Sequence, residues 1–154
     1  SSMAGYRAAF VAGDPALVAR LLEIRKHAGM MVPWPVQQAM LAALRDDTHV
    51  AAQRVRYGIR RGRLRSALED AGYRIEHSDA GLYLWARRDA EGADDAATDA
   101  ATDWSMVAEM ADLGILVAPG SFYGKAGARH VRISLTATDE RINAAVRRLA
   151  TGAS

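Results

Sequence analysis

The segment from Thr48 to Ala71 constrains the fold of this 154-residue chain most, because it predicts one long helix with two apolar sides. Placing its residues at steps of about 100° gives two apolar stripes on nearly opposite sides. One stripe holds Ala51, Val55, Ile59 and Gly62, and the other holds Val50, Tyr57, Leu64 and Leu68. We expect such a helix to be packed on both sides and to bridge two parts of a larger protein.

The same helix is rich in arginine, so nucleic-acid binding has to be considered. Its arginines are Arg54, Arg56, Arg60, Arg61, Arg63 and Arg65. The helical wheel divides them between two flanks, whereas a protein that binds a nucleic-acid groove gathers its positive charge on one face. We therefore interpret these side chains as solvated flanks of the helix and expect no nucleic-acid partner.

Around the long helix the sequence predicts a small sheet and further helices. Strands are expected at residues 8–12, 73–77, 82–87, 115–118 and 130–135, and further helices from Pro15, Val36, Trp104 and Thr138. Asp14 is a good N-cap for the first of these helices, and Gly29 a good end. Residues 89–103 are acidic and repetitive, typical of a low-complexity loop. The sum predicts an α+β fold, with helices packed on a small sheet.

Cysteine is absent from the sequence, and Lys26 and Lys125 are the only lysines. Both lysines stand in polar or glycine-rich surroundings that are typical of the protein surface. The lack of cysteine excludes a disulfide framework and a thiol nucleophile. With no long apolar run and no targeting signal, we expect a cytoplasmic protein without a membrane partner. The four histidines lie far apart in the sequence, so we expect no metal site.

Two arginines are candidate anion-binding residues. Arg7 follows Gly5-Tyr6 and precedes an apolar run, where a guanidinium could hold a phosphate through paired hydrogen bonds. Arg132 lies in an alternating segment whose other face is apolar, beside a glycine-rich loop, and could hold a carboxylate. For each, an ordinary surface arginine remains the alternative on these residues alone. The loop at residues 119–127 does not match the phosphate-binding P-loop, because three residues separate its glycines and Ala126 follows the lysine.

Taken in order, five runs resemble the C-terminal portion of fold-type-I, class I/II aminotransferases over essentially the whole chain. They are AGYR at 4–7, RKHAGMMVP at 25–33, SDAGLYLW at 78–85, VAPGSFYG at 117–124 and HVRISLTATDER at 130–141. The resemblance is closest to the actinobacterial succinyldiaminopimelate transaminase type. It implies that residues 1–13 end a large-domain sheet. Residues 14–154 would then form bridging helices and a small domain.

The resemblance also implies a cofactor, pyridoxal 5'-phosphate, and roles for individual residues. Arg7 would bind the cofactor phosphate, and Arg132 would bind the α-carboxylate that amino donor and oxo acceptor share. Tyr83 and Tyr123 would lie near the substrate. The lysine that forms the Schiff base would fall just before Ser1, so no catalytic residue is expected in this chain. We therefore expect it to be an inactive fragment of a longer enzyme.

The expected reaction is transfer of an amino group from an amino acid to 2-oxoglutarate, with N-succinyl-LL-2,6-diaminopimelate as the expected donor. Another amino acid could take the donor's place, because a carboxylate-binding arginine recognises only the shared part of these substrates. A stand-alone interaction domain without catalysis is the third interpretation. The aminotransferase resemblance further implies a homodimer, in which residues 30–35 approach the partner subunit's active site.

Overall fold

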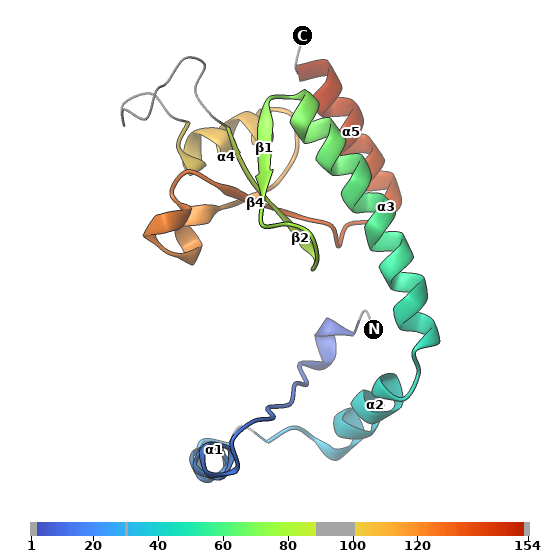
Figure 1. Cartoon of the computed structure of the whole chain (residues 1–154), viewed down its shortest axis with the longest axis vertical. Coiled ribbons are helices and arrows are strands. Elements are labelled where there is room, and N and C mark those ends of the chain that lie inside the picture. Colours follow the sequence, from blue (N-terminus) through green and yellow to red (C-terminus); the bar gives the residue numbers. More distant parts are fainter. Residues whose placement is uncertain (1–2, 30, 89–100, 153–154) are drawn as a thin grey trace. The chain divides into compact units, whose positions relative to one another are not determined.

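The computed structural model describes residues 3–29, 31–88 and 101–152. The chain divides into two compact units, Ser1–Arg54 and Val55–Ser154. The junction lies within helix α3, Thr48–Asp70, which is labelled in Figure 1. None of the helices in the described ranges has the length and hydropathy needed to cross a membrane.

The first unit is built from helices. A short 3-10 turn, Ala4–Tyr6, precedes α1, Pro15–His27, and α2, Trp34–Leu44. Asp14 caps α1 as predicted, because its carboxylate accepts hydrogen bonds from the backbone N–H groups of Ala16 and Leu17 at 2.9 and 3.0 Å. Helix α2 begins two residues before the predicted Val36, since a proline is tolerated in the first turn of a helix.

The strand predicted at residues 8–12 is wrong for this structure. These residues form no regular element, and the Phe10 side chain is 66% exposed. A strand needs a neighbour to satisfy its backbone hydrogen bonds, and the described part of the first unit contains no other strand.

The second unit contains a four-stranded antiparallel sheet in the order β1-β2-β4-β3. The strands are β1, Tyr73–Glu76; β2, Tyr83–Arg88; β3, Ala118–Pro119; and β4, Val131–Ser134. The predicted strand at residues 115–118 is largely wrong, because only its last residue pairs with β4. Leu116, in the middle of that apolar run, is 94% exposed.

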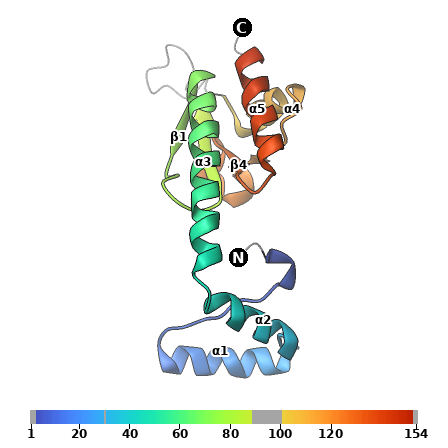
Figure 2. The same cartoon turned by 90° about the vertical axis from the view of Figure 1, so that its right-hand side faces the viewer.

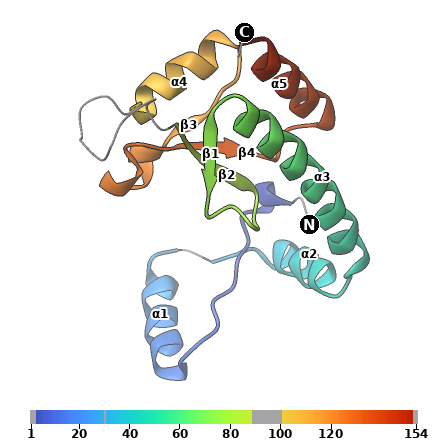
Figure 3. The same cartoon turned by 45° about the horizontal axis from the view of Figure 1, so that its top comes forward.

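Three helices cover one face of this sheet (Figure 3): the second half of α3; α4, Asp103–Asp112; and α5, Asp139–Gly152. Alternation along the strands sends one set of side chains into the core. The buried core consists of Leu64, Leu68, Tyr73, Leu84, Ala86, Met106, Met110, Val131, Ile133, Leu135, Ile142 and Leu149. The α+β class predicted from the sequence is confirmed.

Helix α3 is not packed on both sides within the described chain. Leu64 and Leu68, from one predicted stripe, are buried in the core. Val55 and Ile59, from the other stripe, are 65% and 52% exposed. Figure 2 shows α3 running beyond the part that lies beside α5.

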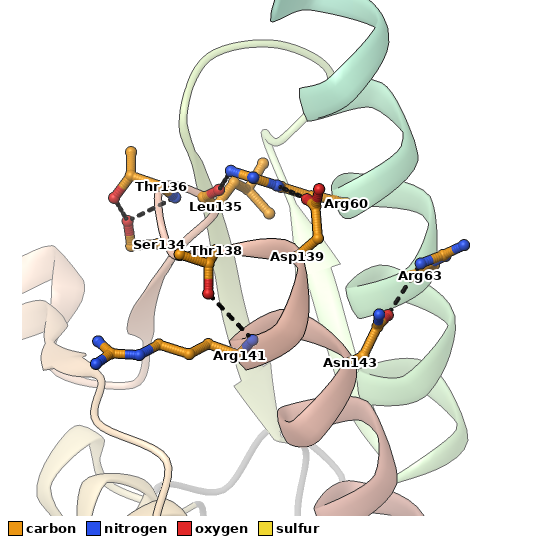
Figure 4. Close-up of polar contacts among 9 residues, drawn as sticks. All are labelled: Arg60, Arg63, Ser134, Leu135, Thr136, Thr138, Asp139, Arg141 and Asn143. Carbon is orange, nitrogen blue, oxygen red and sulfur yellow. Dashed lines mark hydrogen bonds and ion pairs between the residues drawn. The ribbon is translucent and has the colours of Figure 1, made fainter. Parts of the chain in front are cut away.

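The arginines of α3 are not all solvated, which corrects the sequence interpretation. Arg60 donates to the Leu135 carbonyl at 3.1 Å and pairs with the Asp139 carboxylate, as Figure 4 shows. Arg61 donates to the carbonyls of Ser78 and Gly81 at 2.7 and 2.5 Å. These two residues therefore tie α3 to the turn before β2 and to the turn after β4.

We predict that Arg61→Ala lowers the free energy of unfolding by about 1.5–3 kcal/mol, because two hydrogen bonds from a charged donor to carbonyl groups are lost. Arg65→Ala is the matched control on the same helix. Among the described residues Arg65 pairs only with Glu69, and the pair is exposed, so its loss should cost under about 0.5 kcal/mol. Urea denaturation of the two variants measures the difference, and equal losses would contradict the anchoring role of Arg61.

Candidate functional site

The face of the sheet away from the helices carries a cluster of aromatic and charged side chains around Arg132. Arg132 lies in β4 opposite Trp85 of β2. Its guanidinium carbon lies 4.1 Å from the centre of the Tyr83 ring and 4.9 Å from that of Tyr123. Rings at these distances attract a cation through their negative faces. The structure therefore brings together all three residues for which substrate binding was predicted.

Arg132 has unused capacity to donate hydrogen bonds. Its Nε atom is buried, and no group among the described residues accepts a hydrogen bond from it. Its guanidinium forms no ion pair with a carboxylate of the described chain either. A buried donor without a partner is costly, and a bound acceptor from outside the chain is one way to satisfy it. A carboxylate matches the planar fork of arginine through two parallel hydrogen bonds.

Tyr123 reaches Arg132 because the glycine-rich loop folds back on itself. The loop forms two 3-10 turns, Gly120–Tyr123 and Lys125–Gly127. The Gly120 N–H donates to the His130 carbonyl at 2.8 Å. A Cβ atom on Gly120 would lie 2.2 Å from the Gly127 carbonyl oxygen, and one on Gly127 would lie 2.1 Å from that of Gly120. Only glycine fits at both positions, because backbone meets backbone there.

Asp103 fastens the same loop to the start of α4. Its buried carboxylate accepts hydrogen bonds from the backbone N–H groups of Ser121 at 2.9 Å and Trp104 at 3.0 Å. Burial raises the pKa of Asp103, but these hydrogen bonds together outweigh it and leave the pKa below its usual value. This anchor was not predicted from the sequence, because Asp103 stands at the end of the low-complexity segment.

Tyr83 is positioned by the turn between β1 and β2. The Ser78 hydroxyl donates to the Glu76 carbonyl at 2.6 Å and accepts from the Trp85 N–H at 2.9 Å. Arg61 binds two carbonyls of the same turn from α3. The turn therefore enters β2 in a fixed register, with Tyr83 opposite Ser134 on the open face.

A second group, Trp85 with His130 and Glu76, lies next to this cluster and was missed by sequence reasoning. Trp85 stacks on His130 with ring centres 5.0 Å apart and meets Tyr123 edge-on at 5.9 Å. His130 Nε2 donates to the Glu76 carboxylate at 3.1 Å. This hydrogen bond lowers the pKa of Glu76, outweighing an opposing effect of burial. The sequence signal that could have found His130 was the alternation of residues 130–135, which places His130, just before β4, on the same side as Arg132.

Arg7 lies in the first unit. It follows the 3-10 turn with φ of 53°, and its backbone N–H donates to the Ala4 carbonyl at 3.2 Å. Its side chain is exposed and forms no hydrogen bond or ion pair with any described residue. A free guanidinium on an irregular loop fits a phosphate ligand.

Neither lysine has the surroundings of a Schiff-base residue. Lys26 is half exposed and pairs with Glu23 at 2.7 Å, and Lys125 is exposed in the glycine-rich loop. Such a residue needs an amine of lowered pKa in a desolvated pocket. Across the described ranges, no three His, Cys, Asp or Glu side chains come together as metal ligands.

The 4-dedimethylamino-4-oxo-anhydrotetracycline transaminase OxyQ of Streptomyces rimosus is 58% identical over 97% of this chain. A Mycobacterium tuberculosis protein named "Probable aminotransferase" is 59% identical over 97% of the chain. The chain spans 38% and 33% of the lengths of these two relatives.

Solved structures of aminotransferases share the fold. The match to the aromatic aminotransferase of Pyrococcus horikoshii covers 96% of this chain and 38% of the Pyrococcus chain. Its TM-score is 0.80, at 26% identity. The N-succinyldiaminopimelate aminotransferase of M. tuberculosis matches 92% of this chain and 36% of its own, with a TM-score of 0.72; at 24% identity it shows the fold alone. The family model "Aminotransferase class I and II" matches residues 1–149. The chain therefore belongs to the class I and II aminotransferases, a family that uses pyridoxal 5'-phosphate.

Proposed function

We propose that the complete protein is a pyridoxal-phosphate-dependent aminotransferase and that this chain supplies its carboxylate-binding residue, Arg132. The observation that carries the proposal is the buried Nε of Arg132, which has no acceptor in the described chain although two tyrosine rings hold the guanidinium in place. An amino acid and a 2-oxo acid share one α-carboxylate. A single arginine can therefore bind donor and acceptor in turn.

Tyr83 and Tyr123 have a supporting role in this proposal. Their rings flank the guanidinium and restrict the directions from which water reaches it. A less hydrated guanidinium binds a carboxylate more strongly, because the charges attract each other in a medium of lower dielectric constant. The rings also limit the rotation of the arginine side chain, so less entropy is lost when the substrate binds.

Arg7 is the residue that we propose for the cofactor phosphate. Its exposed guanidinium, free of partners in the described chain, matches a phosphate group in charge and geometry. Pyridoxal phosphate, when bound, supplies the electron sink for chemistry at the substrate Cα. The contribution of this chain is to bind and orient the anionic groups, since neither of its lysines is placed for the Schiff base.

The specific reaction that we propose uses N-succinyl-LL-2,6-diaminopimelate as amino donor and 2-oxoglutarate as acceptor, in a cytoplasmic homodimer. The five sequence runs, which resemble that transaminase type, support it. Met31 and Trp34, which lie within the segment expected at the partner subunit, are exposed, and this supports the dimer. A different substrate is the second candidate, favoured by the 58% identity to a transaminase named for an anhydrotetracycline.

A donor panel with the complete protein tests the specific reaction. We expect the succinylated donor to give the highest kcat/KM with 2-oxoglutarate as acceptor. Glutamate formation measures transfer from donors other than glutamate itself. A protein that aminates other oxo compounds but leaves the succinylated donor untouched would contradict the proposed substrate and keep the reaction class.

Replacing Arg132 tests the carboxylate anchor. We predict that Arg132→Ala lowers kcat/KM roughly 30- to 1,000-fold, because a charged hydrogen-bond partner is removed. This factor corresponds to a loss of about 2–4 kcal/mol of transition-state stabilisation. Arg132→Lys should recover only part of this loss, since an ammonium group lacks the planar fork. Arg129→Ala removes an exposed arginine three residues away and should change little. Unchanged kcat/KM in Arg132→Ala would remove Arg132 from the site.

Replacing Arg7 tests the phosphate contact. We predict that Arg7→Gln retains less pyridoxal phosphate after gel filtration, because one charge-assisted phosphate contact is lost. Arg20→Gln, at an exposed position on α1, is the matched control. The absorbance of bound cofactor per protein is the measurement. Equal cofactor content in the two variants would count against the role of Arg7.

A further inference from the structure

We propose that His130 and Glu76 are positioning residues for the carboxylate site. They act through Trp85, which holds Tyr123 against Arg132. The inference rests on the proposed function in one respect, namely that Arg132 binds the substrate carboxylate. The arrangement of the aromatic rings can be measured without any substrate.

Trp85 contacts the loop that carries Tyr123. Trp85 meets the Tyr123 ring edge-on, with ring centres 5.9 Å apart and planes at 79°. The Trp85 ring also lies against Gly120, where an added Cβ would come within 2.9 Å of its outermost carbon. Trp85 therefore supports the loop at its glycine hinge and at its tyrosine.

Trp85 is itself supported by His130 and, through His130, by Glu76. The His130 ring stacks on the indole, with planes at 14° and ring centres 5.0 Å apart. The His130 side chain is only 14% exposed, and its Nε2 pairs with the Glu76 carboxylate. Glu76 is held in turn by Arg87 at 2.9 Å and Arg74 at 3.6 Å. A chain of contacts thus runs from β1 through His130 and Trp85 to Tyr123.

Loss of the His130 stack should change the surroundings of Arg132. Without the His130 stack the indole can rotate, and Tyr123 then loses its edge-on contact. The guanidinium would keep the Tyr83 ring on one side but would gain water on the other. Carboxylate binding should weaken, whereas the chemistry at the cofactor should proceed as before once the substrate is bound. The expected signature is a change in KM with kcat preserved.

The experiment uses the complete protein with its cofactor and four single variants. His130→Ala removes the stack and the ion pair, His130→Phe keeps a ring, and Glu76→Gln keeps the shape of the carboxylate without its charge. We expect KM for 2-oxoglutarate to rise about 3- to 10-fold in His130→Ala, the range expected for an aromatic contact, and less in the other two. Glu69→Gln, which removes an exposed ion pair on α3, is the matched control and should leave KM unchanged.

Near-ultraviolet circular dichroism separates this inference from the proposed function. His130→Ala should change the signal of the fixed tryptophan and tyrosine side chains, and should add little in a Trp85→Phe background. If the protein shows no transamination but this pattern holds, the proposed function fails and the positioning role stands. An unchanged spectrum in His130→Ala, or an unchanged KM in a protein that transaminates, overturns the positioning role. Should His130→Ala fail to fold, His130→Phe and Glu76→Gln decide by the same two measurements.

Discussion

The antiparallel pairing of β2 with β4 is the constraint on which the second unit depends. It places Leu84 opposite Ile133 in the core and Trp85 opposite Arg132 on the open face. Because side chains alternate along a strand, a slip of one residue would bury the charged set and expose the apolar set. The burial of the core pairs under α3, α4 and α5 therefore also fixes which side chains surround Arg132.

The site is held by hydrogen bonds from well outside the sheet. Arg61 of α3 fixes the turn that leads to Tyr83, and Asp103 at the start of α4 fixes the loop that leads to Tyr123. The close contact between Gly120 and Gly127 lets that loop return to the strand. The Nε donor of Arg132 is buried without an acceptor in the described part of the chain, at a cost in stability. Under the proposed function, the substrate carboxylate accepts this hydrogen bond, and a cost of this kind is typical of functional sites.

Local sequence patterns predicted the parts of the structure that depend on neighbouring residues. Helical periodicity located α3, and strict alternation placed Arg132 on the face away from the core. The expectation that Tyr83 and Tyr123 lie near the substrate came from family resemblance, because no local pattern joins residues of different strands and loops. The contacts of Arg61 and the His130–Glu76 pair, whose members lie 54 residues apart, were missed for the same reason. The strand predicted at residues 8–12 failed because an apolar run does not show whether a partner strand is present.

The proposed function depends on Arg132 binding the α-carboxylate of the substrate. The most direct test is a crystal structure of the complete protein with cofactor and 2-oxoglutarate. We predict that the α-carboxylate lies on the Arg132 guanidinium, with two parallel hydrogen bonds of about 2.7–2.9 Å, between the rings of Tyr83 and Tyr123. A bound substrate whose α-carboxylate rests on another cationic group, with Arg132 turned to solvent, would contradict it.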